Sequence, residues 1–183
     1  MTEGDHPFWL FSVAVYGRPG FHEACLDLQT QHSLDINLML CCCFVAWSGG
    51  GRLSGAELED LLNATEDWYN DVVEPVWRAQ RRLKDGISGF DASKVADLRQ
   101  SLVTAELVAE RMAQDRLYEL LDITSNSDRE MSDRLSDAVA NLITYLHRHG
   151  SGQISDSAFQ TILGGCFSEL PESQIKSTIA ELQ

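Results

Sequence analysis

The stretch SLDINLMLCCCFVAWSGGG, residues 33–51, decides the fold of this chain. Every residue from Leu38 to Trp47 is apolar, so a helix built from them has no polar face. A helix that is apolar all round must be enclosed by other elements. A buried strand would suit so short a run equally well, but no second strand-like run exists to pair with it. We therefore predict a central buried helix over about residues 34–47.

Helical periodicity governs the rest of the chain as well. Apolar residues recur at helical spacing in segments that begin near residues 7, 21, 54, 91 and 131. Pro75 should kink or break the segment that runs from residue 54 to about residue 84, because proline lacks the N–H that would bond to the carbonyl of Asp71. The predicted fold class is all-α, a compact multi-helix bundle around the buried helix at about residues 34–47.

The C-terminal part of the chain predicts a short helical pair. Phe159, Ile162 and Leu163 share one face, and a second apolar stripe follows the turn at Pro171. We expect residues 1–150 to form the helical bundle domain. Residues 151–183 are expected to be an appendage of that same domain, since few residues separate the two.

The net charge of −14 is the main anomaly of composition. It opposes binding to the nucleic-acid backbone and to anionic membrane surfaces, because long-range repulsion slows each encounter. It is compatible with a basic protein partner, and it equally well serves solubility alone. Nucleic acid is therefore not expected among the partners. A membrane span is not expected either, since the run from Leu38 to Trp47 is about half as long as a bilayer requires.

The cysteines bear on the compartment. The chain has five, an odd number, and Cys41, Cys42 and Cys43 lie within the apolar run. This setting favours reduced, buried thiols that act as small apolar side chains. The acidic residues Glu3 and Asp5 stand where a secretory signal peptide would be basic. We predict a cytoplasmic location.

The best local site hypothesis is a group of cations beside an aromatic ring. Its members are Trp77, Arg78, Arg81, Arg82 and Lys84, with Arg99 as a further neighbour. Guanidinium groups at adjacent helical positions can hold a phosphate or carboxylate, and the Trp77 ring offers a stacking plane. A purely structural role is the alternative, because cations favour a helix C-terminus and Glu74 pairs well with Arg78 at i,i+4 spacing.

An acidic face on the same segment is a second candidate. It comprises Glu59, Asp60, Glu66, Asp67 and Asp71, with no Lys or Arg between them. Such a face can recruit a basic segment of a partner protein. It is equally the ordinary solvated side of a surface helix.

The remaining constellations point away from chemistry. Glu106 and Glu110 share one helical side, but the Glu-x-x-His motifs of di-metal bundles are missing. If Glu106 faces inward, pairing with an arginine such as Arg78 or Arg81 is the expected explanation. Asp35 and Asn37 at the start of the buried helix suit capping, although such a pair can also orient a ligand. We predict no catalytic residue, no metal site and no cofactor.

The N-terminal two thirds resembles an uncharacterised family of small proteobacterial proteins over roughly residues 8 to 121. The residues that carry the resemblance are Phe8-Trp9, Tyr16, Ala24-Cys25-Leu26-Asp27-Leu28-Gln29, Asp35-Ile36-Asn37-Leu38, Pro75-Val76-Trp77-Arg78, Arg81-Arg82-Leu83-Lys84, Glu106-Leu107 and Ala109-Glu110-Arg111. The resemblance implies a bacterial cytoplasmic protein with helical segments. It implies no reaction, because the family has no assigned function.

Two functions fit these observations. The favoured one is a non-enzymatic helical interaction protein, an adaptor or regulator that uses the acidic surface to bind another protein. The alternative is a small-ligand-binding protein or enzyme with an anion site lined by Arg78, Arg81, Arg82 and Trp77. Geometry separates them, since an enclosed pocket at Trp77 supports the second and a flat acidic face supports the first.

Overall fold

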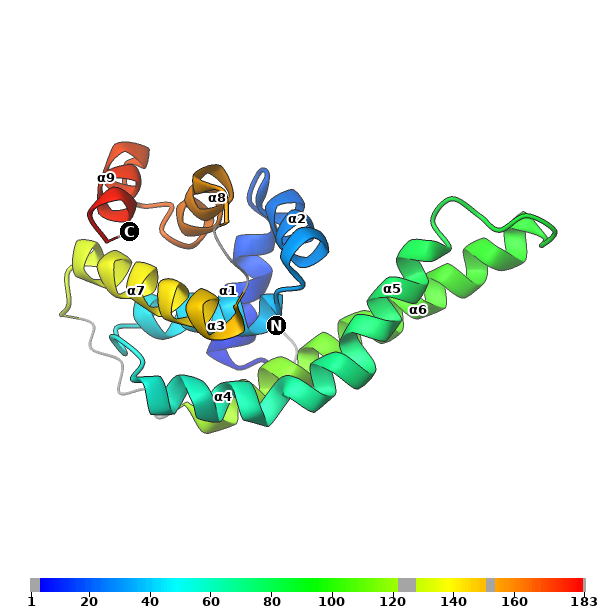
Figure 1. Cartoon of the computed structure of the whole chain (residues 1–183), viewed down its shortest axis with the longest axis horizontal. Coiled ribbons are helices and arrows are strands. Elements are labelled where there is room, and N and C mark those ends of the chain that lie inside the picture. The colour runs from blue at the N-terminus through cyan, green and yellow to red at the C-terminus, as the bar shows by residue number, and fades with distance from the viewer. Residues whose placement is uncertain (1–3, 122–127, 151–153, 183) are drawn as a thin grey trace.

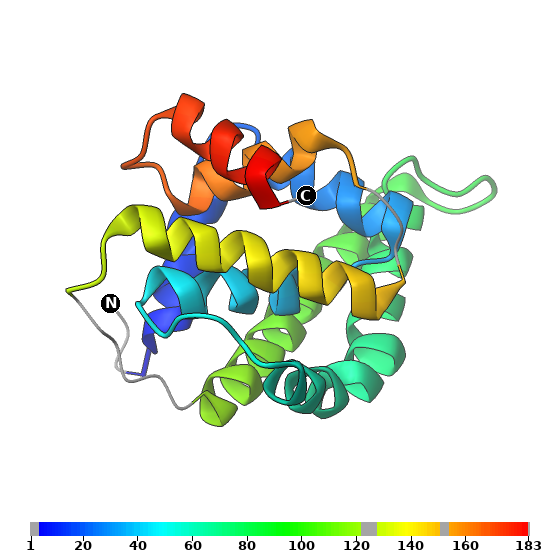
Figure 2. The same ribbon diagram turned by 60° about the vertical axis from the view of Figure 1, so that its left-hand side comes forward.

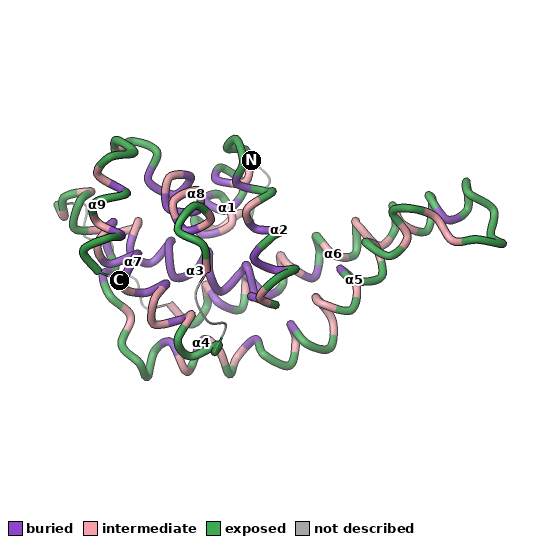
Figure 3. Tube along the Cα trace, turned by 45° about the horizontal axis from the view of Figure 1, so that its top comes forward, coloured by how far each residue is buried: buried purple, intermediate pink, exposed green. Residues whose placement is uncertain are grey.

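The central helix is α3 (Ile36–Trp47), as predicted. The computed structural model describes residues 4–121, 128–150 and 154–182, and every side chain from Ile36 to Ala46 is buried. Asp35 caps the helix, because its carboxylate accepts hydrogen bonds from the N–H groups of Asn37 at 2.9 Å and Leu38 at 3.3 Å. Figure 3 shows the burial concentrated along this helix and its neighbours.

Helices from both ends of the chain enclose α3. The helices α1 (Pro7–Tyr16), α7 (Met131–His149) and α8 (Asp156–Cys166) contact α3 directly, as does the long helix α6 (Ala92–Leu120). Outside them, α2 (Phe21–His32) packs on α8 and α1, and α9 (Glu172–Leu182) packs on α7 and α8. Helix α7 lies along α3 in both ribbon views, Figures 1 and 2. The ring of Phe8 stacks on that of Phe44 with 5.1 Å between centroids. The part of the chain that the structure describes contains helices and no strand, which confirms the all-α fold class.

The segment that contains Pro75 forms three consecutive pieces. They are α4 (Gly55–Trp68), the π-helical segment η1 (Tyr69–Val73) and α5 (Glu74–Arg82). The expected capping box is present, with Ser54 and Glu57 each accepting from the other's backbone N–H. In place of a sharp kink, the N–H of Glu74 bonds to the carbonyl of Tyr69, one residue beyond α-helical spacing. Because the turn is wider there, the backbone stays helical although Pro75 has no N–H to donate.

Helix α5 and the long helix α6 (Ala92–Leu120) form a hairpin that projects away from the remaining helices (Figure 1). Its base is attached to the core through α4 and α6. The indole N–H of Trp68 donates to the carbonyl of Ala109 at 3.0 Å, and the hydroxyl of Tyr69 donates to the carbonyl of Leu34 at 3.3 Å. Toward the tip the hairpin is mostly exposed, and the ring of Phe90 has 71% of its surface accessible.

The C-terminal helical pair shares the main core. Phe159, Ile162 and Leu163 of α8 are buried in the same apolar cluster as α3, and α9 packs on α7. Gly165 lets α8 approach the ring of Phe21 on α2 closely. We propose that residues 128–182 and the bundle form one domain. The predicted boundary at residue 151 falls on residues that lie outside the described ones.

Two further features concern the cysteines and the possibility of a membrane-spanning helix. All five cysteines are free and buried. No helix among the described residues is both long and apolar enough to cross a membrane.

Candidate functional site

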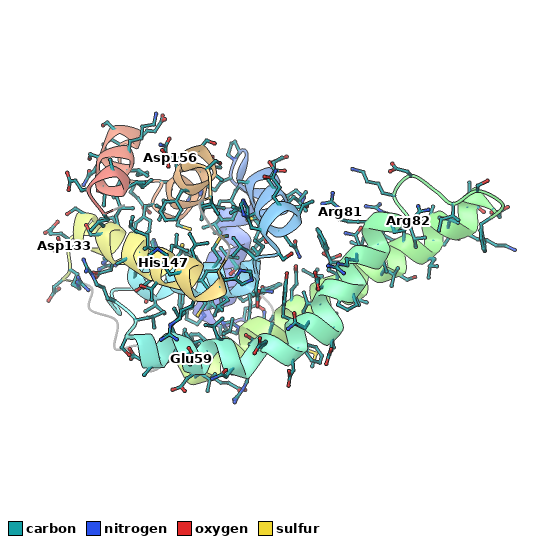
Figure 4. All side chains as sticks on the ribbon, viewed as in Figure 1. Glu59, Arg81, Arg82, Asp133, His147 and Asp156 are labelled. Atoms are coloured by element: carbon teal, nitrogen blue, oxygen red, sulfur yellow. The ribbon has the colours of Figure 1, made fainter. Side chains whose placement is uncertain are left out.

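Arg81 and Trp77 form the centre of the site. Trp77 is the one buried residue of α5, and the guanidinium carbon of Arg81 lies 5.0 Å from the centroid of its ring. Arg81 also reaches across to α2, where its Nη1 donates to the Thr30 hydroxyl at 3.2 Å. Figure 4 shows Arg81 on the hairpin opposite α2. The arginine therefore spans the space between the hairpin and α2.

The other predicted cations divide between this space and solvent. Lys84 lines the same space as Arg81. Arg78 lies outside it and forms an ion pair with Glu74 at 2.7 Å, as the structural alternative expected. Arg82 lies nearer the hairpin tip (Figure 4), where it donates to the carbonyl of Gly86 at 3.5 Å. The structure thus brings the buried Trp77 and the exposed Arg81 and Lys84 to one cleft, and it leaves Arg78 and Arg82 outside that cleft.

The space is a cleft of about 440 Å³ between α2 and the α5–α6 hairpin, called the arm cleft below. Its lining residues are Tyr16, His22, Cys25, Leu26, Gln29, Trp77, Gln80, Arg81, Lys84, Arg99, Val103, Glu106, Leu107 and Glu110. Apart from the adjacent pair Glu106 and Leu107, the α6 members recur at three- and four-residue intervals, so one face of that helix forms a wall. The cleft combines cations, carboxyl groups and an apolar strip.

Three buried polar atoms at the arm cleft have no hydrogen-bond partner. They are Trp77 Nε1, Gln80 Oε1 and Arg99 Nε. Trp77 has only 8% of its surface exposed. A buried donor or acceptor without a partner costs about 1–3 kcal/mol, so such groups are rare in proteins and call for an explanation. Three of the five such atoms among the described residues lie at this cleft, which makes it the candidate site.

Glu106 and Glu110 face the same cleft. The Gln80 side chain hydrogen bonds with Glu106, and burial raises the pKa of Glu106 while the charges of Arg99 and Arg81 oppose that rise. The sequence predicted that an inward-facing Glu106 would pair with an arginine. The charges of Arg99 and Arg81 do act on Glu106, but its hydrogen bond is to Gln80. Burial raises the pKa of Glu110 to about 7, and the charge of Glu106 adds to the effect.

The residues of the predicted acidic face lie in different surroundings. Glu59 makes an ion pair with Arg148 of α7 at 2.8 Å. Glu59 and Glu66 also line a second cleft, of about 580 Å³, between α4–η1 and the ends of α3 and α7. Asp60 lines another hollow beside α6, and both Asp67 and Asp71 are exposed.

Asp35 lies at the second cleft. Its carboxylate is buried, and burial raises its pKa to about 6, against the two backbone hydrogen bonds that it accepts as the cap of α3. Across the described residues, no three His, Cys, Asp or Glu side chains are grouped so that they could hold a metal ion.

Sequence reasoning missed the contribution of the N-terminal helices to the arm cleft. Tyr16 of α1 and Cys25 of α2 hydrogen bond to each other at the cleft wall, and Gln29 of α2 lines it as well. No local pattern marks these residues, because they reach the hairpin only through tertiary packing. The α6 side of the cleft could be recognised from the sequence, because Arg99, Glu106 and Glu110 fall on one side of the predicted helix.

Comparison with known proteins places this cleft inside a recognised sequence family. Residues 7–117 match the family described as "Protein of unknown function (DUF2390)". Every residue that lines the arm cleft lies between positions 7 and 117. No curated protein and no solved structure matches the chain. Since the match spans more than half of the 183 residues and agrees with the resemblance seen in the sequence, the chain belongs to this family of proteins of unknown function.

Proposed function

We propose that this protein binds a small ligand with an anionic group in the arm cleft. The observation that carries the proposal is the set of three unpartnered polar atoms, Trp77 Nε1, Gln80 Oε1 and Arg99 Nε. Two of them are donors, and a carboxylate or phosphate is an acceptor with several lone pairs. An anionic group that accepts from Trp77 Nε1 and Arg99 Nε would remove the cost of those two donors, while Gln80 Oε1, an acceptor, would need a donor on the ligand.

The charges at this end of the cleft support an anionic group. Arg81 and Lys84 join Arg99 there, and their side chains reach a region walled by Trp77. Hydrogen bonds between guanidinium groups and carboxylate or phosphate are about twice as strong as neutral ones. These three cations stand out in a chain whose net charge is −14.

The cleft also has the size and the composition of a small-molecule site. Ligand pockets are concave, of about 300–1,000 Å³, with apolar walls and a few polar groups that fix orientation. Leu26, Val103 and Leu107 supply the apolar wall here. Nothing in the cleft identifies a nucleophile with an activating base, so we propose binding rather than catalysis.

Native mass spectrometry of the protein, purified under mild conditions from the cells that make it, tests this proposal. We expect a co-purifying small mass in the parent protein that is lost in Arg81→Ala. Arg78→Ala is the matched control, because Arg78 is one helical turn away and its partner is Glu74 outside the cleft. A ligand mass that persists equally in Arg81→Ala would contradict the assignment to this cleft.

An interaction protein is the second candidate function, and one observation favours it. Leu98, Val108 and Met112 on α6 are each more than half exposed. Exposed apolar side chains along one helix often mark a contact with another protein. We expect Val108→Asp to abolish stoichiometric capture of a protein partner if this surface is used, while Gln100→Asp, at an exposed position on another face of the same helix, leaves capture unchanged. A cytoplasmic setting remains part of this proposal, supported by the five free, buried cysteines.

A further inference from the structure

The two ends of the arm cleft carry opposite charges. On α6, Arg99 lies toward the hairpin tip, and Glu106 and Glu110 lie toward the core. A helix rises 1.5 Å per residue, so the Cα atoms of Arg99 and Glu110 are about 16 Å apart along the axis. Arg81 and Lys84 of α5 add to the positive end. Between the ends, the wall is formed by Val103 and Leu107, which are apolar.

Glu110 is the unbalanced group at the inner end. Within the described ranges, no hydrogen bond or ion pair joins its carboxyl group to another residue. The charges that act on it are those of Glu106 and Asp35, which are both negative. The arginines of the cleft act on Glu106 instead. Glu110 is half-buried at the cleft wall, and a carboxyl group that has no partner in this position takes up a proton or is matched by a cation.

The other neighbours of Glu110 offer no cation. Tyr16 of α1 and Cys25 of α2 hydrogen bond to each other, and burial raises the pKa of both groups, so both are neutral. His22 of α2 lines the cleft without an ion pair to Glu110. The inner end therefore has an excess of negative charge, enclosed by groups that are neutral or apolar.

We infer that the ligand is dipolar, with an anionic group at the Arg81–Lys84–Arg99 end and a protonated amine at Glu110. An apolar chain that connects the two groups would lie along Val103 and Leu107. The inference rests on the proposed function, which requires only the anionic group. It adds a second recognition element, and it names the ligand class as small zwitterions whose charges are separated by an apolar spacer.

A calorimetric titration with matched probes tests the inference. The probes are linear ω-aminocarboxylic acids of increasing chain length, each compared with the unsubstituted carboxylic acid of the same length. At the best length, we expect the amine to tighten binding about tenfold or more, since a factor of ten in Kd needs only about 1.4 kcal/mol. Glu110→Gln removes the charge and keeps the size of the side chain, and it should abolish this gain.

Controls separate the failure of this inference from failure of the proposed function. Glu119→Gln, on the same helix but outside the cleft and paired with Arg116, should keep the gain from the amine. Arg81→Ala should weaken both probe series equally. If the carboxylic acids bind in an Arg81-dependent manner and the amine adds nothing, the dipolar ligand is overturned and the anion cleft stands. If neither series binds the parent protein at millimolar concentration but inorganic phosphate does, the dipolar ligand is overturned and the anion cleft stands. If phosphate does not bind either, both proposals are overturned.

Discussion

The guanidinium group of Arg81 lies over the ring of Trp77, 5.0 Å from its centroid, while the indole N–H of the same Trp77 has no hydrogen-bond partner. One face of the ring is thus covered by a cation, and its polar edge is left unsatisfied. Folding alone does not reward this arrangement, because the buried donor lowers stability. In the proposed complex, the ligand would supply the acceptor that this donor lacks.

Replacement of the Trp77 indole should affect ligand binding and the stability of the fold differently. Phenylalanine lacks the unpartnered donor, and the relief of that donor offsets the packing lost with the smaller ring. Trp77→Phe should therefore change the free energy of unfolding by less than about 1 kcal/mol, while ligand binding weakens. Trp68→Phe is the control, because its indole N–H donates to Ala109 and its loss should cost about 1–2 kcal/mol. Urea unfolding measures both. Equal destabilisation by the two substitutions would contradict the account.

The packing of α8 on α2 is tested at two adjacent glycines. A Cβ at Gly165 would meet the ring of Phe21, with Cε2 at only 2.8 Å, whereas a Cβ at Gly164 would lie at an ordinary 3.9 Å from Ile175. Overpacking of this kind costs about 1–3 kcal/mol, so Gly165→Ala should lower Tm clearly. Gly164→Ala should be neutral or stabilising, because alanine favours a helix interior. Similar Tm values for the two variants would show that α8 is not packed on Phe21.

Asp35 should make stability depend on pH. Its pKa rises from 3.8 to about 6 in the folded protein, so the folded state holds a proton that the unfolded state has lost. Stability from this group is complete below about pH 4 and is lost as the pH rises through about 6. Asparagine also caps helices, so Asp35→Asn should be more stable than the parent by about 1–3 kcal/mol at neutral pH. The advantage should shrink toward pH 4, and a difference that does not vary with pH would contradict the assignment.

The capping box of α4 gives a fourth prediction. Ser54→Ala removes the acceptor for the N–H of Glu57, and it should cost about 1 kcal/mol. Ser136→Ala is the control, because this exposed hydroxyl bonds only to the carbonyl of Ser132 within α7. Alanine is the better helix former there, so stability should stay the same or rise slightly. Chemical unfolding of the two variants provides the comparison.

The predictable part of this fold is local. The run from Leu38 to Trp47 has no polar side, which leaves only an enclosed position for that helix, and Ser54 with Glu57 marks the start of the next. Pro75 indicated an interruption, but the π-helical form of that interruption depends on packing. Trp68 and Tyr69 are held by the carbonyls of Ala109 and Leu34, and neither contact is visible in the local sequence.

The arm cleft was predictable only in part, for the same reason. Helical spacing grouped Arg78, Arg81 and Arg82 on one segment, but the rotation of α5 about its axis decides which of them faces inward. That rotation follows from the burial of Trp77, a tertiary effect. The opposite wall comes from α2, about fifty residues earlier in the chain, as the contact between Thr30 and Arg81 shows.

The indole N–H resonance of Trp77 provides the most direct test of the central claim, that an anionic ligand group binds in the arm cleft. The chain has four tryptophans, and single Trp→Phe variants assign their four indole signals. We predict that short carboxylic acids and inorganic phosphate, added separately, identify at least one class that shifts the Trp77 signal saturably. The signals of Trp9, Trp47 and Trp68 should stay in place, and Arg81→Ala should abolish the shift. A Trp77 signal that responds to neither probe, or responds equally in Arg81→Ala, would contradict the account.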